Sequence, residues 1–349
     1  MVRVTGNFTS ESSLDPATKS ALLAAFDQGW ADPKKLSQAS RTAAQLRNRA
    51  IESIATRLGI APQNCEILGE PSLGHFLGIA GFLSPQRKLY FSAIDQGKVR
   101  AVARAHTGTV EEIAVTDQGQ FIYPKNIATD AVISWQLANS ETGAIQSNAA
   151  EFEVFKYRYV DATAAGGQVA LPENWSSALF DARSWGGPAG LAILAIREER
   201  SYDYPLPKIA PIKSPGSYSL PLLLGAAVAL ENYEPASQEI RGHLLRKISS
   251  LPNEIAAVAP DTPALANKIS LVIADVSGEQ LVAQLAKEGF DVDSGSACSP
   301  EDLQPSHVLA AMGYPTNGHI RLTLHPGTTT VAVDQLIAKI CQVRRQLLG

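Results

Sequence analysis

Two short stretches of small residues carry side chains whose types and spacing could do chemistry. The first, Ser294-Gly-Ser-Ala-Cys-Ser-Pro300, places the thiol of Cys298 among small residues that leave it room to move. Ser299 and Pro300, followed by two acids, are typical of a helix start. A helix N-terminus lowers the pKa of a nearby thiol, although the two acids oppose that effect. The pattern predicts an exposed, reactive thiol; the alternative is a bystander cysteine in a turn.

The second stretch, Asp181-Ala-Arg-Ser-Trp-Gly-Gly-Pro-Ala-Gly190, holds three glycines and a proline in ten residues. It lies between two apolar runs, residues 175–180 and 191–196, which we expect to form adjacent strands. Open α/β sheets gather their chemistry at strand ends. The stretch therefore predicts a tight, structured loop at a functional edge of a sheet.

A third candidate, Arg321, lies in a strand-like segment, His319-Ile-Arg-Leu-Thr-Leu324. Apolar residues alternate there with Arg321 and Thr323, so the arginine falls on the polar face. A guanidinium fork is suited to binding a carboxylate. The alternative is a solvated arginine on a strand.

The composition bounds what the chain can do. With 349 residues, 45% of them hydrophobic, it can bury a large core, and a net charge of -4 argues against a dedicated nucleic-acid binder. We see no signal-peptide pattern and no run long enough to span a bilayer, so we expect a cytoplasmic protein without membrane partners. Cys65 and Cys341 lie in apolar segments and are expected to be small core residues.

The elements that position these residues follow an α/β order. Asp15 and Pro16 predict a helix start, and residues 39–58 predict a long amphipathic helix. Residues 131–138 form an apolar run suited to a buried parallel strand, and residues 155–161 a strand that ends in Asp161. From Pro235 onward the pattern becomes α+β.

These motifs resemble those of the cysteine desulfurase family, the class V aminotransferases with a pyridoxal phosphate fold of type I. The resemblance rests on the 181–190 loop, on Asn139-Ser-Glu-Thr-Gly-Ala-Ile-Gln146 and on the Cys298 loop, and it spans essentially the whole chain. It implies an α/β fold with a large domain, residues 13–232, built on a mostly parallel seven-stranded sheet flanked by helices. A smaller α+β domain would comprise residues 1–12 and 233–349 and carry the Cys298 loop.

The resemblance also implies roles for individual residues. Cys298 falls on the cysteine that attacks the substrate sulfur and becomes a persulfide, and Arg321 on the arginine that clamps the substrate carboxylate. Asn139 falls in a region that contacts cofactor and substrate. Asp161 falls on the aspartate that pairs with the pyridine nitrogen of the cofactor, although an aspartate at a strand end could equally cap the next segment.

Other positions depart from the family pattern. Ser184 stands where the family lysine forms a Schiff base with pyridoxal phosphate, and a hydroxyl cannot form an imine. The phosphate loop contains Glu70 and Pro71, which add a negative charge and remove a backbone donor. The remaining cofactor positions are Gln96 at the stacking histidine, Arg183 at the histidine beside the lysine, and Ser217 in a segment where the family has an arginine.

The leading hypothesis is a cysteine-desulfurase-like protein that has lost catalysis with pyridoxal phosphate and needs no cofactor. It would act as a partner subunit or a sulfur-accepting protein through Cys298. The competing hypothesis is an active pyridoxal-phosphate-dependent desulfurase that supplies sulfur for iron-sulfur clusters or thio-modification. The cofactor would then be held without an imine, or a nearby lysine such as Lys208 or Lys213 would replace the family lysine. A third hypothesis is a heterodimer, rather than a homodimer, in which the chain donates residues to an active paralogue.

Overall fold

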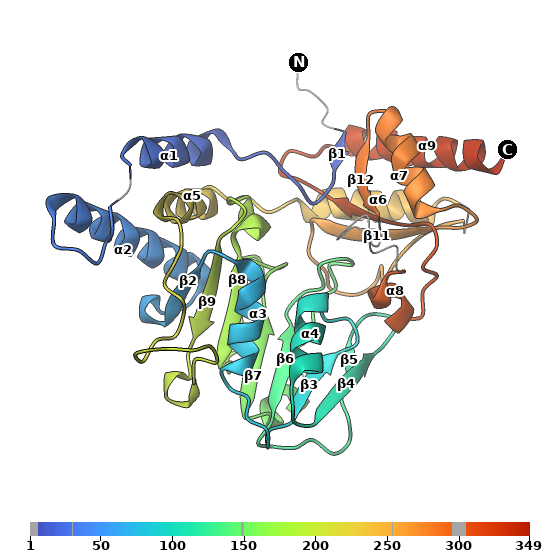
Figure 1. Cartoon of the computed structure of the whole chain (residues 1–349). Coiled ribbons are helices and arrows are strands. Elements are labelled where there is room, and N and C mark those ends of the chain that lie inside the picture. Colours follow the sequence, from blue (N-terminus) through green and yellow to red (C-terminus); the bar gives the residue numbers. More distant parts are fainter. Residues whose placement is uncertain (1–5, 30, 148–149, 253, 295–304) are drawn as a thin grey trace.

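The computed structural model describes residues 6–29, 31–147, 150–252, 254–294 and 305–349. Its strands form two sheets, one of eight strands and one of five. Figure 1 shows the large sheet with helices on both of its faces and the small sheet beside it, next to the C-terminal helix. The candidate residues outside the Cys298 loop lie on these two sheets and on the loops that leave them.

The large sheet is mostly parallel. Strand β9 is antiparallel to both of its neighbours, and β5 forms a hairpin with β4. The predicted mostly parallel sheet is therefore confirmed, but the two-residue β5, which follows a turn at Gly119, makes the strand number eight instead of seven. The order is β2 (Cys65–Leu68), β9 (Ala192–Ile196), β8 (Ser177–Asp181), β7 (Tyr157–Asp161), β6 (Val132–Gln136), β3 (Leu89–Ser92), β4 (Val110–Val115) and β5 (Phe121–Ile122).

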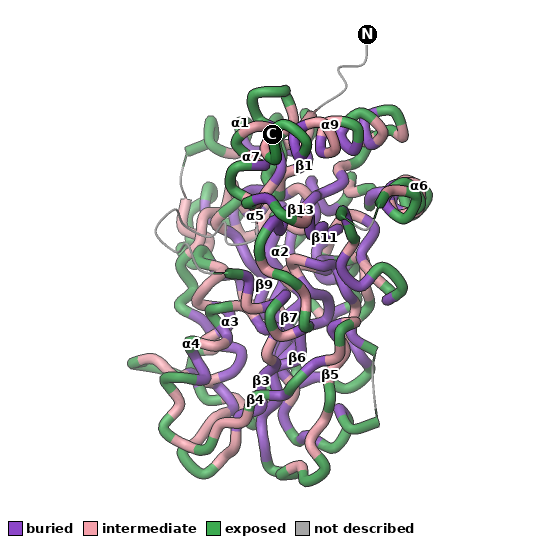
Figure 2. Tube along the Cα trace, turned by 90° about the vertical axis from the view of Figure 1, so that its right-hand side faces the viewer, coloured by how far each residue is buried: buried purple, intermediate pink, exposed green. Residues whose placement is uncertain are grey.

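Helices cover both faces of this sheet because its central strands are apolar on both sides. On β7, Val160 packs with residues of α2 (Gln38–Leu58) and α5 (Leu220–Glu231). Tyr159 points to the other face, where α3 (Pro71–Ala80) and α4 (Gly97–Ala105) lie. Helix α1 (Pro16–Asp27), capped by Asp15 as predicted, packs on α5. Figure 2 shows the buried residues between these layers.

The small sheet has one apolar and one polar face. Helices α6 (Gln238–Ser249), α7 (Gly278–Lys287) and α9 (Thr330–Leu348) pack on the apolar face, which includes Ile320 and Leu322. The strand order is β1 (Asn7–Phe8), β12 (Asp291–Ser294), β13 (His319–Thr323), β11 (Lys268–Ile273) and β10 (Ile255–Ala257). The domain boundaries at residues 12/13 and 232/233 stay a prediction.

Short elements join the two sheets. Helix α8 (His307–Ala311) packs with Ile94 and Val115 of the large-sheet layer. The 3₁₀ helices are η1 (Pro62–Asn64), η2 (Ala150–Val154), η3 (Ala182–Trp185) and η4 (Glu199–Ser201). Among the residues that the structure describes, we find no helix with the length and apolar character needed to cross a bilayer.

Candidate functional site

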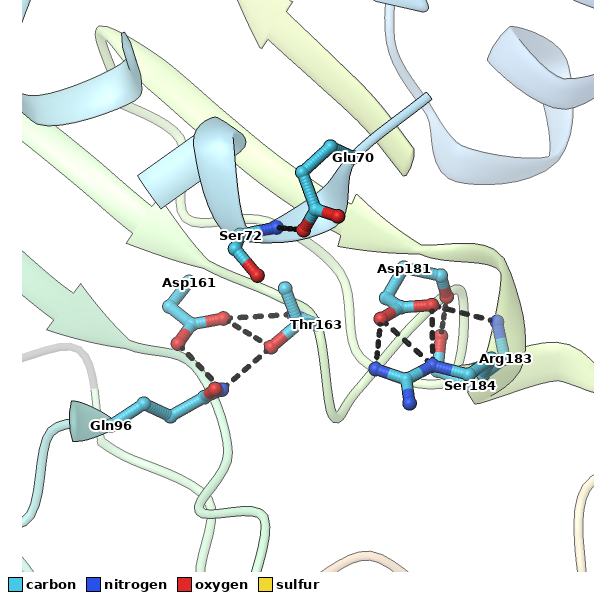
Figure 3. Close-up of polar contacts among 8 residues, drawn as sticks. All are labelled: Glu70, Ser72, Gln96, Asp161, Thr163, Asp181, Arg183 and Ser184. Carbon is cyan, nitrogen blue, oxygen red and sulfur yellow. Dashed lines mark hydrogen bonds and ion pairs between the residues drawn. The ribbon is translucent and has the colours of Figure 1, made fainter. Parts of the chain in front are cut away.

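The candidate residues of the large sheet meet where its parallel strands end. Asp161 is the last residue of β7, and Asp181 is the last residue of β8. Gln96 precedes the first residue of α4, and Glu70 precedes the first residue of α3. We call this group the strand-end site. Figure 3 shows its contacts as three small sets around Glu70, Asp161 and Asp181.

Asp161 is buried, and both of its carboxylate oxygens accept hydrogen bonds from the chain itself. The Gln96 amide Nε2 donates to Oδ2 at 3.0 Å. The Thr163 backbone N–H and hydroxyl donate to Oδ1 at 3.0 and 2.6 Å. Asp161 therefore makes the local turn contacts of a capping residue, and Gln96 and Thr163 are linked to each other by a further bond of 2.8 Å. Nothing in the sequence singled out Thr163.

Two more buried ionisable groups, His75 and Asp95, lie near Asp161. Neither was predicted from the sequence. The His75 Nδ1 lies 3.9 Å from Asp161 Oδ2 and 2.8 Å from the Tyr159 hydroxyl, and burial lowers the pKa of His75. Burial raises the pKa of Asp95 to about 8, and the negative charge of Asp161 adds to that shift. The side chain of Asp95 is thus a neutral carboxylic acid at pH 7.

Ser184 and Arg183 are both bound to Asp181, within the loop that η3 opens. The Ser184 hydroxyl donates to the Asp181 carbonyl oxygen at 2.7 Å. The Arg183 guanidinium donates to the Asp181 carboxylate through Nη2 at 2.7 Å and through Nε at 3.1 Å. Trp185 is buried and donates from Nε1 to the Ala226 carbonyl oxygen at 3.1 Å. The predicted tight loop between adjacent strands is confirmed, and it is anchored to α5.

The N-terminus of α3 is capped by a carboxylate of the chain itself. Glu70 accepts a hydrogen bond from the Ser72 backbone N–H at 2.7 Å, and this contact lowers the pKa of Glu70. Pro71, at the first helical position, has no N–H to offer. Ser217 is exposed, and its backbone carbonyl would contact any side chain placed at Gly69.

Asn139 organises the turn that follows β6. Its Oδ1 accepts hydrogen bonds from the backbone N–H groups of Glu141 and Thr142 at 2.9 Å, and its Nδ2 donates to Gln136 Oε1 at 2.9 Å. Gly143 completes the turn with a φ of +78°, which favours glycine. The role of Asn139 toward a substrate stays a prediction, since the amide makes the contacts of a structural turn.

The polar face of the small sheet carries Arg321 and Lys268. Among the residues that the structure describes, no hydrogen bond or ion pair reaches the Arg321 guanidinium, and its Nε is buried. The Lys268 Nζ donates to the Thr323 hydroxyl at 3.0 Å. Burial, together with the smaller effects of the Arg321 and Arg183 charges, lowers the pKa of Lys268 to about 8. Lys268 was not singled out from the sequence, because a lysine in a strand gives no signal by itself.

The Cys298 loop lies outside the described residues. The described chain stops at Ser294, the end of β12, and resumes at residue 305, shortly before α8. The other two cysteines, Cys65 and Cys341, are half-buried and pack against the hydrophobic cores, rather than lying within them as predicted. Burial raises the pKa of Cys65 to about 12 and also raises the pKa of Cys341, so neither thiol ionises readily.

Pyridoxal phosphate fits these residues poorly. It needs an amine at position 184, where the serine hydroxyl is bound to Asp181. It needs free amides at the phosphate loop, where Glu70 already caps the helix. Asp161 has the right chemistry for the pyridine nitrogen, and its oxygens already accept hydrogen bonds from Gln96 and Thr163.

Comparison with known proteins gives sequence matches and structural neighbours. The model of the family "Aminotransferase class-V" matches residues 216–336. The cysteine desulfurase IscS of Methanosarcina thermophila is 28% identical over 235 residues, 62% of this chain and 58% of the relative. The cysteine desulfurase IscS of Dictyoglomus turgidum is 29% identical over 248 residues, 61% of this chain and 60% of the relative. Both matches span less than two thirds of the relative's length.

Solved structures match over nearly the whole chain. A NifS-like protein superposes with a TM-score of 0.82 at 21% identity and covers 98% of this chain and 99% of its own. The NifS-like protein from Rickettsia africae also gives a TM-score of 0.82, at 18% identity, over 97% of this chain and 99% of its own. These likenesses establish the fold. The sequence matches agree with that fold: this chain is similar to cysteine desulfurases, and its residues 216–336 match the class V aminotransferases.

Proposed function

We propose that this chain is a cytoplasmic cysteine-desulfurase-like protein that has lost catalysis with pyridoxal phosphate. It would act as a partner subunit or a sulfur-accepting protein through Cys298. The observation that carries the proposal is Ser184, which stands at the family lysine position and has a hydroxyl bonded to the Asp181 carbonyl oxygen at 2.7 Å. A hydroxyl cannot form the imine on which the family's chemistry depends.

The neighbouring contacts support the same proposal. Glu70 places a carboxylate at the helix start where a phosphate would bind, and two anions repel each other there. The Gln96 amide donates to Asp161 and has no aromatic face to stack on a ring. The polar groups of the strand-end site that a cofactor would use thus already take part in hydrogen bonds within the chain.

The competing function, an active desulfurase, needs another amine in the place of Ser184. Lys208 pairs with Asp203, whose backbone N–H is bound to the Gly81 carbonyl oxygen at the C-terminal end of α3. That end lies about 15 Å from Glu70, given the helical rise of about 1.5 Å per residue. Lys213 pairs with Glu199 at 2.7 Å. Neither lysine contacts the strand-end site.

The test of lost catalysis is chemical trapping. The purified chain is mixed with pyridoxal phosphate, reduced with borohydride and mapped by mass spectrometry, and sulfide release from L-cysteine is measured in parallel. We expect no pyridoxyl-lysine and no sulfide, with the Ser184→Lys variant as the control that restores an amine and Ser184→Ala as its matched partner. A pyridoxyl-lysine in the unaltered chain together with sulfide release would overturn the proposal.

The partner role is tested separately. We expect co-expression with an active cysteine desulfurase of the same host to give a heterodimer in native mass spectrometry, in place of the homodimer. Sulfur transfer should then place a persulfide on Cys298 and none in the Cys298→Ser variant. Exclusive homodimers in the presence of that enzyme would reject the heterodimer, and an unmodified Cys298 would reject the acceptor role.

A further inference from the structure

Two cations lie side by side on the polar face of the small sheet. In the antiparallel pairing of β11 and β13, Lys268 is opposite Thr323, and Ser270 is opposite Arg321. Lys268 and Arg321 are therefore diagonal neighbours on one face, at a typical Cα separation of about 7–8 Å. The face looks toward the turn after β6, since the Ser270 hydroxyl donates to the Glu141 carbonyl oxygen at 2.9 Å.

Neither cation has an ion-pair partner in the part of the chain that the structure describes. Lys268 contacts the neutral hydroxyl of Thr323, and the Arg321 guanidinium has no hydrogen bond there. Two acidic residues lie near without forming an ion pair: Asp293, opposite Arg321 in the β12–β13 pairing, accepts the Ser10 backbone N–H through Oδ2 at 2.7 Å, and Glu141 Oε2 accepts the Ser306 hydroxyl at 2.7 Å. Burying a cation without a paired anion costs free energy. We therefore expect a ligand to supply the anions.

We propose that Lys268 and Arg321 together bind a small molecule that carries two carboxylate groups. Arg321 takes one carboxylate, the role that its position in the family implies, and Lys268 takes the second. L-Cysteine has only one carboxylate, so Lys268 has no anion to bind in that substrate. The inference goes beyond the proposed function and does not depend on whether catalysis has been lost.

The charges that face Lys268 make binding sensitive to pH. Burial lowers the pKa of Lys268 to about 8, with smaller contributions from the charges of Arg321 and Arg183, while Asp293 opposes the shift. Burial lowers the pKa of His325, and the nearby Lys268 charge contributes a smaller part of that shift. A second carboxylate beside Lys268 favours its protonated form, so binding near pH 8 should take up a proton.

The experiment compares succinate with butyrate, which have the same carbon number but two carboxylates and one. Isothermal titration calorimetry at pH 7 on the full chain without added pyridoxal phosphate should show succinate binding at least about tenfold more tightly, a factor of ten being about 1.4 kcal/mol. Lys268→Met should abolish that preference, and Lys268→Arg should retain most of it. The matched control is Lys339→Met. Lys339 is paired with Glu288 at 2.8 Å, and its replacement should leave the preference for succinate unchanged.

A second readout separates binding from folding. Succinate titrations at pH 8 in two buffers of different ionisation enthalpy should show proton uptake in the unaltered chain and none in Lys268→Met, with circular dichroism confirming that the variant is folded. Equal affinities for succinate and butyrate, no binding of succinate, or an unchanged preference in folded Lys268→Met would each overturn the proposal. The trapping experiment for pyridoxal phosphate is read independently, so failure of one proposal is distinguishable from failure of the other.

Discussion

The strand-end site and the polar face of the small sheet differ in how far their charged groups are paired within the chain. At the strand-end site, Asp161, Asp181 and Glu70 each accept hydrogen bonds from neighbouring residues of the same chain. On the small sheet, Arg321 and Lys268 make no ion pair with any described residue, although Asp293 lies opposite Arg321 in the β12–β13 pairing. A buried polar group without a partner costs free energy. The contrast therefore separates a region whose polar groups are hydrogen-bonded within the chain from one whose two cations lack an ion pair among the described residues.

The two regions are nevertheless within electrostatic reach of each other. The positive charge of Arg183, at the strand-end site, lowers the pKa of Lys268 on the small sheet. An anion bound at Lys268 would therefore be attracted by Arg183 as well, although Arg183 is bound to Asp181 at 2.7 Å. The strand-end site and the small sheet thus both contribute positive charge around Lys268.

The largest expected effect is on the pH dependence of stability and comes from Asp95, a buried neighbour of Asp161. Its raised pKa of about 8 means that the folded chain holds a proton that the unfolded chain releases near pH 4. The free energy of unfolding should therefore fall as pH rises between 5 and 7, by about 1.4 kcal/mol per pH unit for one proton. Asp95→Asn, neutral at every pH, should remove that slope in urea denaturation curves.

The matched control for that slope is Asp117→Asn, because Asp117 is exposed in the turn before β5. We expect Asp117→Asn to leave the slope as it is in the unaltered chain. If the free energy of unfolding still falls with pH in Asp95→Asn, another buried group holds the proton. Asp95 would then not be the neutral acid near the strand-end site.

A smaller effect is expected at the start of α3. Glu70→Ala removes a helix cap and should lower the free energy of unfolding by about 1 kcal/mol. It also frees the Ser72 N–H, so inorganic phosphate should raise the melting temperature of this variant more than that of the unaltered chain. Asp15→Ala, which removes the cap of α1, should cost a similar amount without any gain in phosphate response. Equal responses of the two variants would count against a former phosphate site at Glu70.

The smallest effect tests the polar face of the small sheet. Because the folded state lowers the pKa of Lys268 from 10.5 to about 8, its charge opposes folding below pH 8, and this penalty diminishes as pH rises toward 10.5. Lys268→Met should therefore raise the free energy of unfolding at pH 7, by up to about 1 kcal/mol after allowance for partial exposure. A loss of stability in Lys268→Met would indicate that the lysine is held for packing and not for a ligand.

Much of the fold could be predicted from the sequence because apolar runs and helix caps are patterns of neighbouring residues. The apolar runs became strands β6, β8 and β9, and Asp15 with Pro16 began α1, since strand burial and helix capping depend on residues close in sequence. Strand β5 was missed because a two-residue strand has no period to detect. The Cys298 loop stays a prediction from its sequence.

The sequence alone determined which chemical groups the candidate site has: no amine at Ser184, a carboxylate at Glu70, a guanidinium at Arg321. Only the tertiary structure decided how those groups are used. It brought Gln96 and Thr163 onto Asp161 and buried Asp95 beneath them. The pairing of β11 with β13 also placed Lys268 diagonal to Arg321, although the two residues are 53 positions apart in the sequence. Hydrogen bonding, desolvation and charge coupling depend on distances in space, which residue order does not give.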